Sequence, residues 1–79
     1  MAERLPLYAA LGRAVKELRG ERELTQEALA FASGLDRTFV GAIERGKRNV
    51  TMTTLERLAH GLEIEEPQLV ARAKALQEE

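Results

Sequence analysis

The side chains best suited to recognition chemistry lie in the middle of the chain, between Asp36 and Asn49. This stretch holds four basic residues against two acidic ones. The Arg37 guanidinium can donate two hydrogen bonds to O6 and N7 of a guanine, a pairing worth about 1–3 kcal/mol of discrimination. The neighbouring Thr38 offers a hydroxyl and a methyl group to a base edge. We therefore expect contact with nucleic-acid bases; the plainer alternative is a set of solvated charges.

A second group of residues is suited to phosphate. Arg48 and Asn49 are followed directly by threonines, so a cation, an amide and hydroxyls meet at the start of a helix. Gln26 opens another helix, where it can bind phosphate or act as a local cap, and Phe39 can belong to the core or lie against sugar-phosphate. The alternative for the loop is a solvated turn. The residues expected at the DNA backbone or groove edge are Gln26, Phe39, Lys47, Arg48, Asn49, Thr51 and Thr54.

Two short helices position these groups. Thr25 is suited to cap a helix from Gln26 to Ser33, and Gly34 tolerates the positive φ that ends a helix. Asp36 can cap the next helix, which runs to Arg45 and is closed by Gly46. Because so short a connection prevents an antiparallel pair, the sequence predicts a helix-turn-helix whose second helix projects.

The apolar period decides which side of the second helix faces out. Val40 and Ile43 are three residues apart and must point inward, together with one edge of Phe39 or Gly41. Arg37, Thr38 and Gly41 then face outward and are the predicted base-reading residues. Gly41 is small, so the helix can approach the groove floor closely.

Three further helices complete the expected fold. Apolar periodicity predicts one from Leu7 to Arg19 that Gly20 ends, and one from Met52 to Leu62 that Thr51 caps. Pro67 marks the first turn of a last helix that reaches about Gln77. The predicted fold class is all-α, a compact five-helix domain, with residues 1–79 forming a single domain.

Composition removes several classes of function. Without cysteine there is no thiolate site, and the single histidine, His60, cannot make a metal site of the usual ligand number. No phosphate-binding glycine loop, serine elbow or paired-carboxylate cluster is present, so we expect neither an enzyme nor a cofactor. Since no apolar run reaches the length of a membrane span or signal peptide, we expect a cytoplasmic protein that does not associate with membranes.

Charge is distributed unevenly, although the net charge is only −1. From Glu56 to Glu79 there are six acidic residues and three basic ones, the reverse of the middle of the chain. The acidic third would be repelled by phosphate. The sequence therefore predicts a molecule with a basic face and an acidic back.

The central segment resembles the helix-turn-helix of the Cro and phage-repressor superfamily, so a lambda-repressor-like fold is implied. The residues that carry the resemblance are Gln26, Leu29, Ala30, Gly34, Leu35, Val40 and Ile43. Ser33 stands where the family more often has an apolar residue, which is expected to loosen the crossing of the helices. The superfamily also pairs an Arg near the end of the first helix with a Glu late in the third, which implies a structural ion pair between Arg19 and Glu44.

Within that superfamily the chain is most similar to the controller proteins of bacterial restriction-modification systems. The similarity lies in the runs Leu35–Phe39 and Ile43–Gly46 and in Arg48 and Asn49. It implies a transcription regulator whose operator lies upstream of its own gene and of an endonuclease gene, and which activates at low occupancy and represses once a second site fills. Double-stranded operator DNA is the implied partner, and RNA polymerase is a further candidate. The similarity also implies that Phe39 belongs to the DNA-facing surface.

A homodimer is expected because so short a chain makes a marginal core, and because the resemblance implies one built from the last two helices. Its half-sites on a pseudo-palindromic operator would lie about 34 Å apart. The apolar stripe of the last helix could instead finish the monomer core. The predicted interface residues are Met52, Leu55, Ile64, Leu69, Val70 and Ala73.

Two other functions fit the same residues. A phage-type repressor or an antitoxin would keep the fold and the DNA, and a neighbouring gene for a toxin, endonuclease or methyltransferase would decide between them. A helical adaptor would instead bind a protein through the stripe of the last helix. DNA binding that weakens steeply with salt would count against the adaptor.

Overall fold

Helices account for all the regular secondary structure in residues 4–79, the part of the chain that the computed structural model describes. This confirms the predicted all-α class and the number of helices. The five are α1 (Leu7–Glu21), α2 (Gln26–Ser33), α3 (Arg37–Glu44), α4 (Met52–Leu62) and α5 (Glu66–Gln77).

The three caps expected around the central segment are present. The Thr25 hydroxyl accepts a hydrogen bond from the Ala28 amide at 3.0 Å, and the Asp36 carboxylate accepts one from Thr38 at 2.8 Å. At the start of α4 the Thr51 hydroxyl accepts one from the Thr54 amide at 3.1 Å. Each cap satisfies a donor that the first turn of a helix leaves free.

The turns agree with the sequence at Gly34 and differ from it at Gly20. Gly34 has φ of 68°, the left-handed conformation that ends α2 and lets α3 leave at an angle. Gly20, in contrast, stays helical, so the prediction that it ends α1 is wrong. The left-handed residue after α1 is Glu23, with φ of 55°. The position of a glycine in the sequence therefore predicts the end of a helix only approximately.

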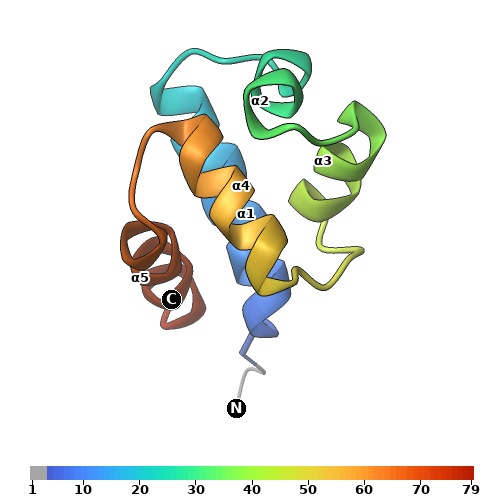
Figure 1. Ribbon diagram of the computed structural model, residues 1–79. Coiled ribbons are helices and arrows are strands. Elements are labelled where there is room, and N and C mark those ends of the chain that lie inside the picture. The colour runs from blue at the N-terminus through green and yellow to red at the C-terminus, as the bar shows by residue number, and fades with distance from the viewer. Residues whose placement is uncertain (1–3) are drawn as a thin grey trace.

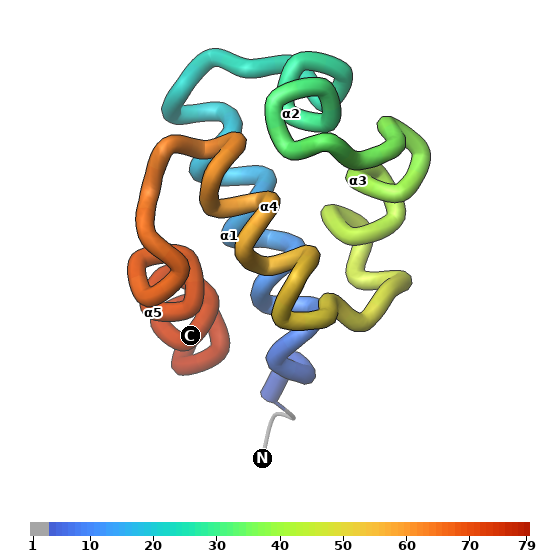
Figure 2. Tube along the Cα trace, viewed as in Figure 1, coloured from blue at the N-terminus to red at the C-terminus, as the bar shows by residue number. Residues whose placement is uncertain are grey.

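The other helices lie around α1 and α4 in the middle of the molecule, where α4 lies in front of α1 and follows a similar direction in this view (Figure 1). One side of α1 packs against α5 and another against α3, while α4 packs mainly against α2. In the tube view, α5 lies on one side of this pair and α2 and α3 on the other (Figure 2). The fully buried large side chains come from all five helices: Val15, Leu29, Val40, Ile43, Leu58, Leu62 and Leu69. Burial of these side chains is the main stabilising term of the fold.

The crossing of α2 and α4 is tight at Ser33. This side chain is 4% exposed, and a Cβ placed on Gly61 would overlap its hydroxyl. The expectation that Ser33 loosens the crossing is therefore wrong, because its small size lets the two helices approach closely. Its Oγ has no hydrogen-bond partner among the described residues, which is a cost that the close packing must offset.

Ion pairs add a polar attachment between the first and last helices. Arg72 on α5 lies 3.1 Å from Glu17 and 2.8 Å from Glu21, both on α1. None of the helices described here combines the length and the apolar character needed to cross a bilayer.

Candidate nucleic-acid interface

The helix α3 is fixed on its inner side and open on its outer side. Val40 and Ile43 are fully buried, whereas Arg37 and Thr38 are exposed at its N-terminal end. The prediction that this end projects from the surface is confirmed. Its two polar side chains are free to meet a ligand.

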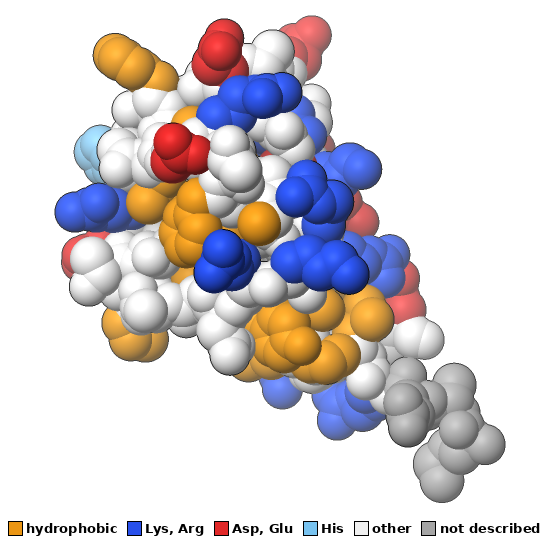
Figure 3. Space-filling view, turned by 90° about the vertical axis from the view of Figure 1, so that its right-hand side faces the viewer, with side chains coloured by type: hydrophobic (Ala, Val, Ile, Leu, Met, Phe, Trp, Pro, Cys, Tyr) orange, Lys and Arg blue, Asp and Glu red, His pale blue; other side chains and the backbone are white. Residues whose placement is uncertain are grey.

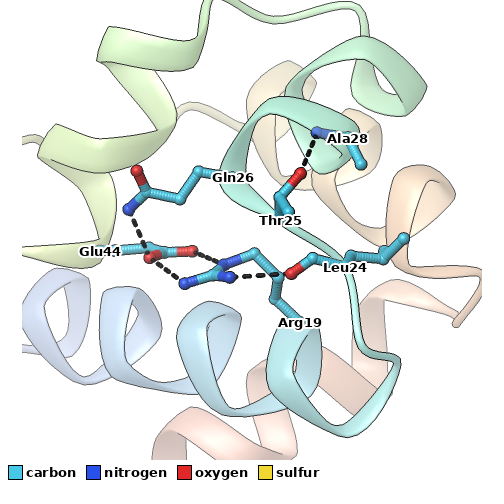
Figure 4. A network of polar contacts seen from close by, with 6 residues as sticks. All are labelled: Arg19, Leu24, Thr25, Gln26, Ala28 and Glu44. Carbon is cyan, nitrogen blue, oxygen red and sulfur yellow. Dashed lines mark hydrogen bonds and ion pairs between the residues drawn. The ribbon is translucent and has the colours of Figure 1, made fainter.

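A polar network fixes the C-terminal end of α3 to α1 and α2 (Figure 4). Arg19 Nε donates to one oxygen of the Glu44 carboxylate at 2.7 Å, and its Nη2 donates to the other at 3.1 Å. Arg19 Nη1 also donates to the Leu24 carbonyl at 2.8 Å. The implied ion pair is thus present. The hydrogen bond with Glu44 raises the pKa of Arg19, because it favours the protonated guanidinium.

The amide of Gln26 belongs to the same network. Its Nε2 donates to Glu44 at 2.9 Å, and it makes no local cap, because the Thr25 hydroxyl serves that purpose. The alternative of a capping glutamine is therefore wrong. Since a carboxylate only accepts hydrogen bonds, the amide orientation is fixed. The Gln26 carbonyl oxygen thus points away from Glu44 and remains available as an acceptor.

Gly41 differs from its prediction. It was expected to face outward, but it is buried. A Cβ at this position would lie 3.1 Å from Nη1 of Arg45 and 3.6 Å from Oε1 of Gln26, so these two side chains cover it. Gly41 lies beside Gln26 of α2, and the sequence of α3 alone does not reveal this neighbour.

Phe39 and Asn49 each combine two environments. Phe39 is partly buried and packs against the core, so it is neither a full core residue nor a free aromatic. Asn49 is exposed, and it also lines an apolar hollow. Their predicted contacts with DNA stay predictions.

The loop after α3 presents the remaining candidates at the surface. Lys47 and Arg48 are exposed. The Thr51 hydroxyl is used as the α4 cap and donates to the Thr54 hydroxyl at 3.1 Å. Lys47 and Arg48 come shortly before the start of α4 in the chain, and the free backbone amides of a helix start are suited to phosphate.

The four cations of α3 and its loop have no acidic partner in the described part of the chain: Arg37, Arg45, Lys47 and Arg48. Arg45 was not among the predicted site residues. The sequence does contain a signal for it, since it follows Thr38 by seven residues, two turns along the same face. The face over α3 shows several Lys and Arg side chains near one another, with an apolar patch just below them (Figure 3).

The predicted dimer residues do not form one surface. Leu69 and Ala73 are fully buried in the monomer, so their assignment to an interface is wrong, and the alternative that α5 finishes the core is confirmed. Ile64 lines a different hollow, with Leu18 and Leu24.

An apolar hollow of about 360 Å³ holds the other three predicted interface residues. The residues that line it are Leu7, Tyr8, Leu11, Asn49, Val50, Met52, Leu55 and Val70. Met52 is 80% exposed. The contribution of α1 was not predicted from the sequence; Leu7, the first residue of that helix, is exposed.

The fold and the exposed face of α3 define a helix-turn-helix domain. The chain matches the helix-turn-helix family over residues 15–69. It is also similar to the control protein C.SmaI of Serratia marcescens, 47% identical over 58 residues that cover 73% of this chain and 69% of that protein.

Two solved structures extend the comparison. The restriction-modification controller protein C.AhdI of Aeromonas hydrophila has a TM-score of 0.76 and 47% identity, and the match covers 78% of this chain and 94% of that one. The tetramer of the controller protein C.Esp1396I, in complex with its natural 35 base-pair operator, has a TM-score of 0.86 and 34% identity, with 92% and 96% covered. The chain therefore belongs to the helix-turn-helix family and, within it, to the control proteins of restriction-modification systems.

Proposed function

We propose that this control protein is a homodimer that binds a pseudo-palindromic operator, with α3 of each copy in a major groove. The observation that supports this most directly is the group of unpaired cations on α3 and its loop. Cations that hold no internal carboxylate can replace the counterions of DNA at no cost in broken ion pairs. The related protein C.Esp1396I binds its natural operator as a tetramer, which supports operator binding by an assembly of several copies.

The residues of this face have separate roles in the proposal. Arg37 and Thr38, at the N-terminal end of α3, read base edges. Lys47, Arg48 and the start of α4 hold phosphate, and thereby set the register of α3 on the duplex. Gln26 serves phosphate through its own backbone amide, because its side-chain amide is engaged by Glu44.

A second copy of the chain is the proposed occupant of the apolar hollow. Exposed Met52 and the partly buried Val70 are apolar groups that a partner of the same composition can cover by two-fold symmetry. Dimerisation matters for function because one half-site would give weak and mostly non-specific binding. The two α3 helices would then be about 34 Å apart, one helical turn of DNA.

The proposal for the regulated genes rests on the membership of this family. We propose an operator upstream of the protein's own gene and of an endonuclease gene, and RNA polymerase as the enzyme whose access the dimer controls in the cytoplasm. The family is one of DNA-binding regulators, which supports a function without catalysis. Burial of Leu69, Ala73 and Leu76 in the monomer removes the stripe on which a helical adaptor would depend.

Selection of bound sites from random duplex DNA tests the proposal. We expect a two-fold symmetric consensus with half-sites spaced by about one helical turn, and affinity that falls steeply with salt. Recovery of no consensus, together with binding that salt does not change, would overturn it. A consensus with a single half-site would overturn the dimer alone.

The dimer surface can be tested by placing one charge in the hollow. Met52→Glu should convert the dimer to monomers in sedimentation experiments, because an unpaired carboxylate would be buried in an apolar interface. Phe31→Glu is the matched control, since Phe31 on α2 is 90% exposed and lies outside the hollow. Dissociation by the control and not by Met52→Glu would place the interface elsewhere.

A further inference from the structure

We infer that Arg45 reads a base edge in the major groove, and that glycine at position 41 is what permits it. This rests on the proposed binding of DNA by α3. The position of Arg45 just after α3 would ordinarily favour a contact with phosphate, because the N-terminal end of the helix is the one that enters the groove. The structure gives this side chain a different direction.

The Arg45 side chain is directed back along α3. Nη1 of Arg45 lies 3.1 Å from the point that a Cβ of residue 41 would occupy. Long side chains on a helix lean toward its N-terminus and cover the turn before their own Cα. The guanidinium is thereby carried one turn back along α3, toward Thr38 and the end of the helix that meets the bases.

The Arg45 guanidinium lies beside an acceptor and has no carboxylate partner in the described part of the chain. The Arg45 guanidinium makes no ion pair with any described residue, so no carboxylate competes with DNA for it. Beside it, Oε1 of Gln26 lies 3.6 Å from the same point over Gly41. That oxygen is turned toward Gly41 because the amide nitrogen donates to Glu44. A donor and an acceptor thus stand next to each other on the outer surface.

The absence of a side chain at Gly41 leaves room for the Arg45 guanidinium. A methyl group at 3.1 Å from Nη1 is closer than an ordinary van der Waals contact, so alanine would force the guanidinium to shift by a few tenths of an ångström. The displaced atom is the end of a flexible side chain, and the backbone of residue 41 is helical. Gly41→Ala should therefore be accepted by the fold, and should even stabilise α3, because alanine is the better helix former. Gly41→Ala should therefore weaken DNA recognition and leave the fold intact.

Affinity for the selected operator and for a scrambled duplex of equal length tests the inference. Arg45→Ala should lower operator affinity about tenfold to a hundredfold, the value of a lost base contact, and lower scrambled-duplex affinity much less. Arg45→Lys should keep the charge and still lose discrimination, because an ammonium group lacks the planar pair of donors. An equal loss on both duplexes, or full rescue by lysine, would show a phosphate contact and overturn the inference.

The role of Gly41 is tested by a double-mutant cycle with thermal unfolding measured in parallel. Gly41→Ala should raise the melting temperature and lower operator affinity, and the affinity loss should disappear in an Arg45→Ala background. Gly20→Ala is the control, since nothing lies within 4 Å of its Cβ position; it should change stability only. A loss of affinity that is the same in both backgrounds would mean that the methyl group blocks DNA directly, and would overturn the inference. Failure of the wild-type protein to bind any duplex would instead overturn the proposed function.

Discussion

Two groups of arginines, on different faces of the molecule, differ in what they contact. On the face of α3 and its loop, Arg37, Arg45 and Arg48 have no carboxylate partner among the described residues. Away from it, Arg22 pairs with Glu63 and Arg72 with Glu17 and Glu21. The net charge of −1 hides this difference. Availability of a cation for DNA depends on its local partners, and the total charge is a poor guide to it.

Arg19 shares a feature with each of the two groups of arginines. It lies close to the α3 face and lines a hollow with Gln26 and Arg37, yet its guanidinium is fully engaged by Glu44 and Leu24. Its side chain is 17% exposed and that of Glu44 is 2% exposed. The two groups therefore differ in their contacts: Arg19 is held by Glu44 of α3, whereas its unpaired neighbours have no carboxylate partner among the described residues.

The largest expected effect comes from breaking that buried pair. Glu44→Ala should lower the free energy of unfolding by about 3–5 kcal/mol, because it leaves the Arg19 charge without its partner. Urea denaturation measures it. Glu56→Ala, at an exposed glutamate of α4, is the control and should change little. Equal stability of the two variants would mean that the network does not hold α3.

Removing Arg37 should have the next largest effect, and on binding only. Arg37→Ala should lower preference for the operator by about 1–3 kcal/mol while weak general DNA binding is kept. Competition between operator and scrambled duplex measures this preference. Arg13→Ala, which removes a cation paired with Glu79, should leave the preference unchanged. Equal loss on both duplexes would refute base reading by Arg37.

Arg48 should produce a smaller and more uniform change. Arg48→Ala should reduce affinity on all sequences and flatten the dependence of log affinity on log salt by about one unit. Arg22→Ala is the paired counterpart and should leave the slope as it is, since that arginine contacts Glu63. A change in sequence preference without a change in slope would contradict the phosphate assignment.

The smallest expected effect is on the pH dependence of stability, and it involves Arg72, one of the arginines that pair with a carboxylate. The hydrogen bond from Arg72 lowers the pKa of the Glu21 carboxyl, so the folded protein binds that proton less tightly than the unfolded chain does. The stabilisation is fully present above the ordinary pKa and is lost as pH falls through the lowered folded value. Glu21→Gln should thus reduce the loss of stability on acidification, measured by urea denaturation over a pH series. An unchanged acid profile would show that the ion pair is too exposed to matter.

Much of this molecule could be predicted from local signals. Caps at Thr25, Asp36 and Thr51 depend on near neighbours in the chain, and the buried face of α3 follows from the spacing of Val40 and Ile43. These features need no knowledge of how distant helices cross, which is why the sequence predicts them correctly.

The errors arise where two distant segments decide the outcome. Gly41 is buried by Gln26 and Arg45, and the environment of Leu69 and Ala73 depends on how closely α5 packs on α1. The apolar hollow likewise joins α1 to the start of α4 and to α5. Periodicity marks a residue as apolar or inward-facing, but it does not say which partner covers it.

The segment between α3 and α4 belongs to two surfaces at once. Lys47 and Arg48 are exposed, while the next two residues, Asn49 and Val50, form part of the apolar hollow. A second copy seated in that hollow would restrain the segment to which we assign phosphate binding. Thermodynamic reciprocity then requires that DNA strengthen self-association by the same factor by which self-association strengthens DNA binding. The fraction of operator bound would then rise more steeply than in proportion to protein concentration. The seven-residue loop between α3 and α4 would thereby make operator binding sensitive to the amount of protein.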